Sequence, residues 1–509
     1  MPKFVILWTD AFVLLTVLAV LFQVVRLRRR PTIAAGWRQV FRRPSAMAAG
    51  VVLACFAVIG VLDSIHYRPL LPPAPGAAGQ QAVHSPITRS ALDAVLDLTQ
   101  LPNRERTYSA PLALRQFTKE SWLVDGDVVR DYPRLRYAGA QLADESQRGA
   151  DLVRRAVTGF IAGLAGAALL AGALTALHGR GRGGWSAGWQ WWWRESDLPW
   201  RAFWATAAVV LLLGGVTLGL AADYHVLGTD RTGNDVLWLS LKSVRTALVI
   251  GLLTTFAMLP PAIVFGITAG YFKGRVDDVV QYVYTTLTSI PGVLLVAACV
   301  LMMQVYIDNN PELFDTVAAR ADLRLFLLCL ILGLTGWAGL CRLLRAEALK
   351  LRELEYVQAA RAFGVSHWRI MRRHLLPNVM HIVLITMVLQ FSGLVLYEAV
   401  LSYLGIGVDP STPSYGTMID AARTEMSRDP MIWWNLLAAF MFLLALVLSA
   451  NIFADAVQDA FDPRMRRIQP RRAGRAGAAQ TAAPAMADSG ASVMAGAAEG
   501  GKGGTDDAR

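Results

Sequence analysis

The chain has 509 residues, of which 54% are hydrophobic and 17% are charged, and its formal net charge is +11. A mean hydropathy of +0.40 excludes an ordinary soluble domain as the main part of the chain, so we expect a membrane protein. The basic residues gather in short loops, as an anionic cytoplasmic leaflet favours, and therefore do not indicate a nucleic-acid partner.

The apolar runs predict the membrane-spanning helices. A helix needs about 20 mostly apolar residues to cross roughly 30 Å of hydrocarbon. Nine runs of this kind are bounded by charge: residues 3–25, 45–62, 156–177, 202–221, 246–270, 280–303, 325–343, 380–403 and 432–455. Pro260, Pro261 and Pro291 lie inside such runs and predict broken or kinked helices in a bundle with an internal path.

The basic loops predict the orientation, because short loops rich in Arg and Lys stay in the cytoplasm. Residues 26–44, 178–201 and 344–379 are such loops, and the segment after Phe461 is also rich in arginine. Nine spans then place the N-terminus outside and the C-terminus in the cytoplasm. A cleaved signal peptide is the alternative for the first run, but this run lacks a basic N-terminal region and RLRRR follows it.

Two segments lie outside the apolar runs. Residues 63–154 are polar and are expected to form an external loop or a small external subdomain, whereas the Ala-, Gly- and Ser-rich residues 468–509 are expected to be disordered. The tail contains GAAEGGKG at 496–503, which lacks the hydroxyl residue and the preceding strand of a phosphate-binding loop. We therefore expect no cofactor in this chain, and its scattered histidines and cysteines predict no metal or catalytic site.

Two carboxylates lie within apolar runs, where a charge is costly. Asp10 is close to the start of the chain and is expected to reach the outer interface. Glu398 is near the outer end of the eighth run, where it is either an interfacial carboxylate or a residue beside a translocation pathway.

The stretch EYVQAARAFGVSHWRIMRRHLLPNV, residues 355–379, lies between two apolar runs. Four of its residues follow the helical spacing i, i+3, i+4, i+7, namely Tyr356, Ala359, Ala360 and Phe363. Gly364 is expected to end this short helix, and a second helical piece is expected to run from Ser366 to a break before Pro377. The hairpin either lies on the lipid headgroups or docks into another protein.

This stretch resembles the EAA motif of binding-protein-dependent ABC importer permeases, which reads EAA, three residues, Gly, nine residues, Ile, one residue, Leu-Pro. The matching positions are Gln358, Ala359, Ala360, Gly364, His374, Leu376 and Pro377. The spacing is kept in full, with Gln358 in place of the glutamate and His374 in place of the isoleucine. The resemblance implies that this loop couples the permease to an ATPase.

A second segment, LGTDRTGNDV at 227–236, resembles the LGTDxxGxDV segment of the C-type permease in dipeptide and oligopeptide importers. Similar segments follow in the order of that family: AGYFKGRVDD at 269–278, SIPGVLL at 289–295, residues 335–362, EAVLSYLGIG at 398–407, PSYGTMI at 413–419 and DAFDPRMR at 459–466. The resemblance implies a motif at the periplasmic face that contains Gly228, Thr229, Asp230, Gly233 and Asp235. Asn234 or Asp235 is also suited to cap the helix that follows.

The resemblance covers about residues 200–467 and implies the architecture. We expect an all-α polytopic membrane protein with a six-helix type-I ABC importer core at 201–467, formed by the last six apolar runs. Residues 1–200 would be an N-terminal extension with about three additional transmembrane helices, at 3–25, 45–62 and 156–177.

The resemblance also implies the function and the partners. The chain would be an inner-membrane permease for peptides or peptide-like solutes, in contact with membrane lipid and not itself an enzyme. Its partners would be a second permease subunit, two ABC ATPase subunits that hold ATP and magnesium, and a periplasmic solute-binding protein. A secondary transporter or channel, and a membrane scaffold, are the two alternatives.

Overall fold

The computed structural model describes residues 3–461, apart from 28–30, 71–83, 86, 98, 125–126, 180–183, 191, 193–196 and 315. The chain divides into two units, Met1–Asp462 and Pro463–Arg509, and all the described residues belong to the first. The tail that the sequence predicts to be disordered, 468–509, lies outside the described residues.

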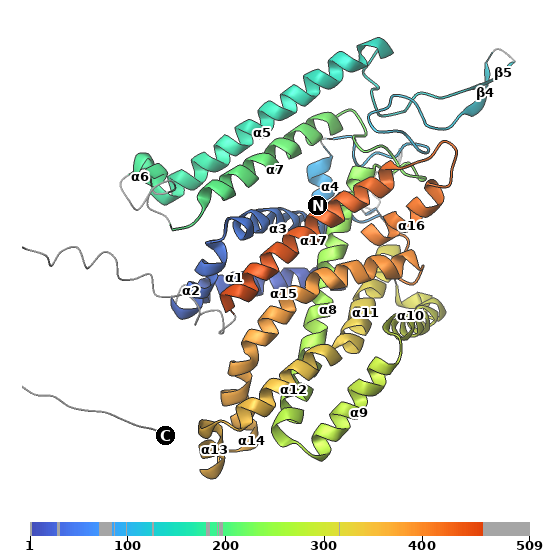
Figure 1. The fold of residues 1–509 in the computed structure, drawn as a ribbon. Coiled ribbons are helices and arrows are strands. Elements are labelled where there is room, and N and C mark those ends of the chain that lie inside the picture. Colours follow the sequence, from blue (N-terminus) through green and yellow to red (C-terminus); the bar gives the residue numbers. More distant parts are fainter. Residues whose placement is uncertain are drawn as a thin grey trace, which may run out of the picture. The chain divides into compact units, whose positions relative to one another are not determined.

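Helices make up most of the described chain (Figure 1). Their bounds are α1 Trp8–Leu27, α2 Pro31–Phe41, α3 Pro44–Asp63, α4 Ala91–Leu96, α5 Arg148–Gly179, α6 Trp185–Gln190, α7 Trp200–Ala221, α8 Val236–Phe272, α9 Arg275–Ser289, α10 Gly292–Asn309, α11 Val317–Gly336, α12 Ala338–Arg352, α13 Glu355–Ala362, α14 His367–Ile370, α15 Leu376–Tyr403, α16 Tyr415–Glu425 and α17 Trp434–Phe461. A π-helical turn, Met371–Leu375, joins α14 to α15.

Two small antiparallel sheets accompany the helices. One contains β1 (Lys3–Val5), β2 (His66–Arg68) and β3 (Arg89–Ser90) in that order, and the other is the hairpin of β4 (Glu120–Val124) and β5 (Asp127–Asp131). In the first sheet Phe4 pairs with Tyr67, so the start of the chain lies on the same side of the membrane as the segment after α3. The described parts of the predicted external region, 63–154, contain β2 to β5 and α4, and its place as an external subdomain stays a prediction.

Most of the predicted spans are present as helices. In the described part of the chain eight helices are long and apolar enough to cross a membrane, and α11 with α12, which meet at a bend of 41°, give a ninth. The predicted span 280–303 is wrong in its position, because the chain is extended at Ile290 before Pro291 and the apolar helix is α10. A residue before proline avoids the helical region, which explains the break.

The other two prolines do not break a helix, and a kink at them stays a prediction. Pro260 and Pro261 lie inside α8, which continues through them to Phe272. The neighbouring helix packs closely here, since a Cβ on Gly333 of α11 would lie 2.9 Å from the carbonyl oxygen of Thr254. Close packing of this kind keeps a proline-containing helix in place.

Helix α8 lies at the centre of the bundle, in contact with α3, α11, α12, α15 and α17 (Figure 1). Helices α5 and α7 form a hairpin of their own that packs on α3. This hairpin is closely packed, because a Cβ on Gly159 would lie 2.4 Å from the carbonyl oxygen of Gly215. The helix packed against α8 and α17 is thus α3, from the predicted extension, whereas α7, predicted as the first core helix, pairs with α5. The domain boundary near residue 200 stays a prediction.

A buried group of charges binds α1 to the bundle. Asp10 of α1 is 1% exposed and accepts a hydrogen bond of 2.5 Å from the guanidinium of Arg245 in α8. Arg245 also lies 3.3 Å from Asp322 of α11. The expectation that Asp10 reaches the outer interface is therefore wrong. A charge within an apolar run is tolerated where it has a partner, and Arg245 is that partner.

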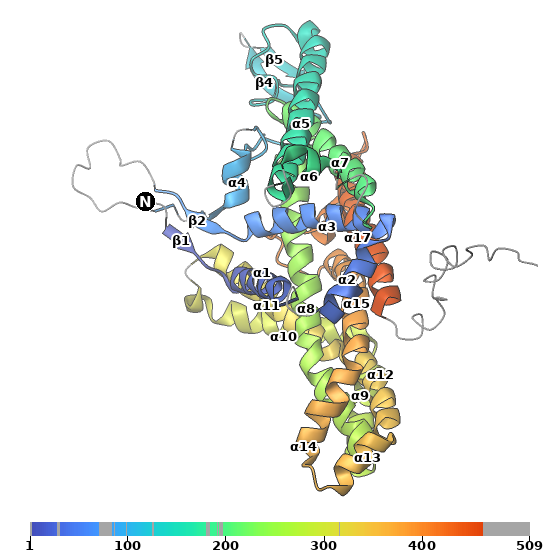
Figure 2. The same ribbon diagram turned by 90° about the vertical axis from the view of Figure 1, so that its left-hand side faces the viewer.

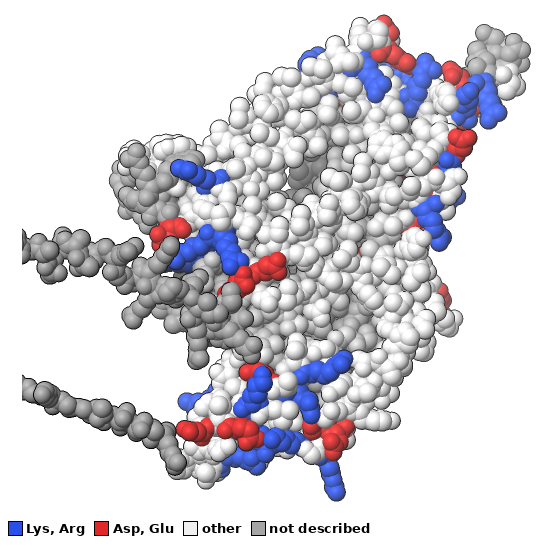
Figure 3. Space-filling model, in the orientation of Figure 1, with Lys and Arg blue, Asp and Glu red and all other residues white. Residues whose placement is uncertain are grey.

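Many of the surface charges lie toward the ends of the molecule. Figure 3 shows charged side chains gathered over α12 to α14 and again around the start of α5 and the β4–β5 hairpin. A further group lies at the left of the view between them, and the rest of the surface between them is largely uncharged. Figure 2 shows the same two groups of elements at opposite ends of the bundle. Such a band of uncharged surface is expected where a protein passes through hydrocarbon.

Candidate functional site

The hairpin predicted at 355–379 is present and its turn has the expected geometry. Gly364 has a φ of +75°, a conformation that glycine adopts readily and residues with a Cβ adopt rarely. The amide of Gly364 donates to the carbonyl of Arg361, and the amide of Val365 donates to that of Ala360, both at 3.1 Å. These two bonds form a Schellman motif, which satisfies the last carbonyls of α13 and ends the helix.

The face that α13 turns toward the permease was not predicted. Val357 is fully buried, in one apolar cluster with Ile370 and Leu375, and Ala360 is half-buried against the same cluster. Apart from Ala360, the predicted stripe faces the other way. Its members Tyr356, Ala359 and Phe363 are exposed, Phe363 by 86%, and Trp368 of α14 is 65% exposed. Exposed aromatic side chains on a rigid support indicate an interaction surface.

Gln358, which stands where the EAA motif has glutamate, has a local structural partner. Its Nε2 donates a hydrogen bond of 3.1 Å to the carbonyl oxygen of Glu353, the residue that follows the last turn of α12. An ionised glutamate has no hydrogen to donate and could not make this bond. Gln358 thus helps to join α12 to α13.

The second limb of the hairpin corrects one prediction. We expected a break before Pro377, but α14 continues through the π-helical turn into α15. Pro377 lies in the first turn of α15, where the missing N–H is not needed. Leu376 is half-buried, and the ring of His374 lies beside that of Tyr356, with centroids 5.9 Å apart. Asn378 donates to the Tyr356 hydroxyl at 3.0 Å, which ties α13 to α15.

One further contact joins the hairpin to the C-terminal end of α8, and two more join the end of α12 to the same place. The hydroxyl of Tyr271 lies 2.8 Å from Nδ1 of His367 in the hairpin. An η nitrogen of Arg352 donates to the Tyr271 carbonyl at 2.8 Å, and Lys273 forms an ion pair of 2.8 Å with Glu353. No role for His367 was predicted, because no local pattern signals a partner so far away in the chain.

At the other side of the membrane the 227–236 segment forms a tight turn. Gly228 and Gly233 have φ values of +73° and +76°, and a Cβ on Gly233 would lie 1.9 Å from the carbonyl oxygen of Glu105. Asp235 caps α8, as predicted, by accepting from the amides of Leu237 and Trp238 at 2.7 and 3.2 Å.

The two remaining members of the predicted motif differ in exposure. Thr229 is buried, and its hydroxyl contacts the loop that contains Ser109. Asp230 accepts hydrogen bonds of 2.8 Å from the amides of Thr232 and Asn234 and so closes the tip of the turn.

A buried histidine supports this turn. His225 is fully buried, with Nδ1 2.6 Å from Asp235 and Nε2 3.5 Å from Glu105. Burial opposes its protonation, but the two carboxylates outweigh this effect and raise the pKa of His225 to about 9. Burial also acts on Glu105, yet His225 and the amides of Arg136 and Tyr137 lower the pKa of this carboxyl. The sequence analysis missed both residues.

Glu398 is 2% exposed and accepts hydrogen bonds from the hydroxyls of Ser402, at 2.6 Å, and Ser414, at 3.0 Å. Ser414 caps α16, so Glu398 holds the loop before α16 against α15. These hydrogen bonds explain why a carboxylate is buried at this position. That Glu398 lies beside the translocation pathway stays a prediction. Within the described residues, no group of three or more His, Cys, Asp or Glu is placed to hold a metal ion.

Many membrane-spanning helices, and a rigid hairpin with exposed aromatic residues at one end of the bundle, define a multi-pass membrane transport subunit. Residues 262–467 match the family described as "Binding-protein-dependent transport system inner membrane component". The chain is 32% identical over 241 residues to the di/tripeptide transport system permease protein DppC of Pseudomonas aeruginosa (strain UCBPP-PA14), which covers 47% of this chain and 73% of that protein.

Two other relatives are similar to this chain over about the same length. The identity is 30% over 244 residues with the dipeptide transport system permease protein DppC of Bacillus subtilis (strain 168), covering 48% of this chain and 70% of that protein. The identity is 36% over 253 residues with the peptidoglycan transport system permease protein YejE of Agrobacterium fabrum (strain C58 / ATCC 33970), and the match covers 49% of this chain and 59% of that protein. The chain belongs to the family of binding-protein-dependent transport system permeases. It is a transport subunit of the inner membrane and not an enzyme, and its family implies ATPase and solute-binding partners.

Proposed function

We propose that this chain forms, with a second permease subunit, the translocation pathway of an ATP-driven importer for peptides or peptide-like solutes. Two ABC ATPase subunits, which hold ATP and magnesium, bind its cytoplasmic side, and a periplasmic solute-binding protein delivers the solute. The cytoplasmic side carries the hairpin and the C-terminus. The peptide cargo is supported by the names of the relatives, which transport dipeptides, di- and tripeptides and peptidoglycan.

The observation that carries the proposal is the two-sided hairpin. Its inner side is a packed support that contains Val357, and its outer side exposes Phe363 and Trp368. A groove on an ATPase subunit that covers these aromatic side chains would bury apolar area without rearranging the permease, which is the usual basis of a docking contact. Gln358, Ala359, Ala360, Gly364, Leu376 and Pro377 set the shape of this coupling element.

The contacts of the hairpin determine which helices would move when the hairpin is displaced. Tyr271 and His367 join it to α8, and Tyr356 with Asn378 joins it to the start of α15. When the ATPase subunits close on ATP, the hairpin moves with them and pulls on both helices together. Since α8 is the central helix of the bundle, this motion reorients the permease between its inward-open and outward-open states.

At the periplasmic face we assign the 227–236 turn to the contact with the solute-binding protein. Gly228, Gly233 and the buried Thr229 and Asp235 shape the turn. The tip of the turn, which contains Asp230, would contact the solute-binding protein. Glu398 is a candidate for the pathway wall in the assembled pair of permeases, although its hydroxyl partners already give it a structural role.

The test is reconstitution. The chain is co-expressed with a second permease, ATPase subunits and a binding protein of the same transport system, and the complex is placed in proteoliposomes. We expect uptake of labelled tri-alanine that requires ATP and the binding protein. Uptake driven by an ion gradient without ATPase subunits would support a secondary transporter, and a complex without solute-stimulated ATP hydrolysis would support a scaffold.

A further inference from the structure

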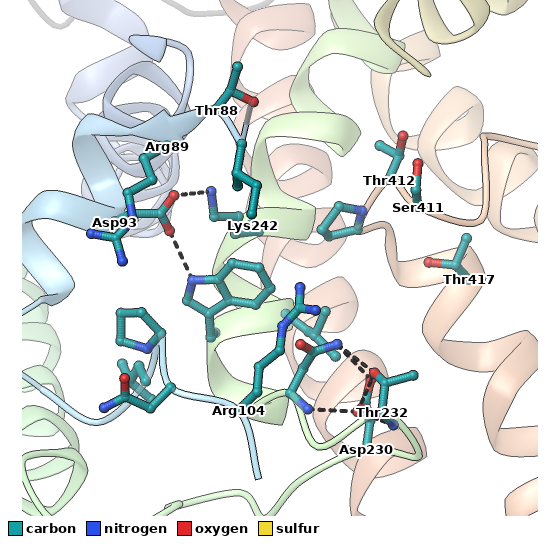
Figure 4. A pocket seen from close by; sticks show the side chains of 18 of the residues that line it. Thr88, Arg89, Asp93, Arg104, Asp230, Thr232, Lys242, Ser411, Thr412 and Thr417 are labelled. Atoms are coloured by element: carbon teal, nitrogen blue, oxygen red, sulfur yellow. Dashed lines mark hydrogen bonds and ion pairs between the residues drawn. The ribbon is translucent and has the colours of Figure 1, made fainter. Parts of the chain in front are cut away.

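A cavity of about 910 Å³ lies at the outer end of α8 (Figure 4). Its walls come from described residues within 66–69, 85–93 and 101–104, from the first turns of α8, from the 230–234 turn, and from the 410–413 loop with α16. Pockets for small ligands commonly measure roughly 300–1,000 Å³, so this cavity has room for a peptide of a few residues. The walls combine hydroxyl groups, such as those of Thr88 and Ser411, with apolar surface from Leu239 and Met418.

One charged side chain in this cavity is available to a ligand. Arg104 extends among the lining side chains (Figure 4), and it has no ion pair or hydrogen bond with any residue that the structure describes. The nearest carboxylates have other partners. Asp230 accepts from the turn that it closes, and Asp93 accepts from Lys242 at 2.8 Å and from Trp238 at 2.9 Å. Arg89 is paired with Asp97 at 3.0 Å.

The opposite side of the cavity has the opposite charge. A second cavity of about 130 Å³ shares His66, Thr88 and residues 411–413 with the first and reaches Arg245 and Asp322. Carboxylates are in excess in this region. Lys242 has two carboxylate partners, Asp63 and Asp93, and Arg245 has two more, Asp10 and Asp322. His66 is the one other titratable side chain in these contacts and binds Asp10 at 2.8 Å.

The cavity therefore offers an unpaired cation at one side and excess negative charge at the other. We propose that it is a binding site for a short zwitterionic peptide, with Arg104 as the ligand of the terminal carboxylate and the terminal ammonium turned toward the acidic side. This inference rests on the proposed function, and it adds a site within this subunit at which the solute stops before it enters the pathway. Arginine suits the role because its planar group binds a carboxylate through two hydrogen bonds.

The test uses the whole complex in lipid nanodiscs, without ATP or binding protein, and titrates it calorimetrically with three probes: tri-alanine, its C-terminal amide and its N-acetyl form. We expect the amide to bind at least about tenfold more weakly than tri-alanine, since it lacks the charge that Arg104 binds. Arg104→Ala should lower the affinity for tri-alanine to that for the amide. Arg104→Lys should recover part of the lost affinity. N-acetylation should also weaken binding.

The matched control is Arg106→Ala. Arg106 lies two residues further along the same segment, does not line the cavity and pairs with Glu120 at 3.6 Å. Its removal should leave the affinity for tri-alanine unchanged. Equal affinities for tri-alanine and its amide, or an Arg104→Ala complex with wild-type affinity, would overturn the site. So would an Arg104→Ala complex that binds the peptide normally but has lost affinity for the binding protein.

The same preparations separate this inference from the proposed function. In proteoliposomes, ATP-driven uptake of tri-alanine together with a negative titration would remove the cavity site and leave the importer intact. Absence of ATP-driven uptake of any peptide would remove the proposed function, whatever the titration shows.

Discussion

The hydroxyl of Tyr271 lies 2.8 Å from Nδ1 of His367, so the last turn of the central helix is bound to the first residue of α14. The two rings also pack together, with centroids 5.6 Å apart. This pair is a direct physical link between the exposed hairpin and the bundle. It is one route by which a force applied to the hairpin reaches α8.

Tyr271→Phe tests this link, because it removes the hydrogen bond and keeps the ring. A neutral hydrogen bond contributes about 1 kcal/mol, which corresponds to roughly a fivefold change in an equilibrium. We expect peptide uptake per ATP hydrolysed to fall severalfold while assembly is unchanged. Tyr282→Phe, on an exposed side chain of α9, is the control. An unaltered ratio of uptake to hydrolysis would show that α8 is not driven through His367.

Gln358→Glu tests whether the coupling element depends on shape or on charge. The substitution restores the glutamate of the EAA motif and removes the hydrogen bond to the Glu353 carbonyl. Because Gln358 is exposed, the expected loss in the free energy of unfolding is at most about 1 kcal/mol. Uptake should stay within about twofold of wild type. A large gain or a complete loss of uptake would mean that charge at this position governs coupling.

The sequence was sufficient for what depends on local chemistry. Hydrocarbon thickness fixes the length of a spanning helix, so the apolar runs could be found, and the Schellman turn at Gly364 follows from the need for positive φ. The span 280–303 was misplaced because an apolar run continues across Ile290, although Pro291 did predict the break there. Pro260 and Pro261 do not break α8, and the close packing of α11 against it could not be predicted from the sequence.

Long-range packing could not be predicted in the same way. In lipid both faces of a helix are apolar, so periodicity does not say that α3 packs against α8 and α17 while α7 pairs with α5. The stripe on α13 was recognised, but its direction was not: Val357 and Ala360 pack against the permease, whereas the other members of the stripe are exposed. His225 and Glu105 come together from distant segments, and neither forms a motif.

The buried histidine predicts a pH dependence. The pKa of His225 rises from 6.5 to about 9 in the folded protein, so protonated His225 stabilises the 227–236 turn. This contribution is complete below pH 6.5 and is lost as the pH rises through about 9. The hydrogen-exchange protection factors of the Arg136 and Tyr137 amides, which donate to Glu105, should fall over that range once the rates are corrected for intrinsic base catalysis. His225→Gln should remove this fall, and a persistent fall in this variant would point to another group.

The α5–α7 hairpin predicts a separation between stability and transport. Gly159→Leu places a side chain against the backbone of α7 and should destabilise the hairpin by roughly 1–3 kcal/mol. Uptake should be nearly unchanged, because the hairpin contacts the bundle mainly through α3. Gly166→Leu is the matched control, since a Cβ there has no atom within 4 Å. Loss of uptake in an assembled Gly159→Leu complex would place the hairpin within the transport machinery.

The central claim, that the hairpin at 355–379 transmits the work of the ATPase subunits, is tested most directly at Gly364. A Cβ at this residue would have no atom within 4 Å, so substitutions act through the φ of +75° and not through a clash. Gly364→Val disfavours this conformation strongly, whereas Gly364→Asn tolerates it. The measurement is ATP-driven uptake of tri-alanine by assembled complexes. We predict at least about a tenfold loss for Gly364→Val and near-normal uptake for Gly364→Asn. Normal uptake by an assembled Gly364→Val complex would contradict the account.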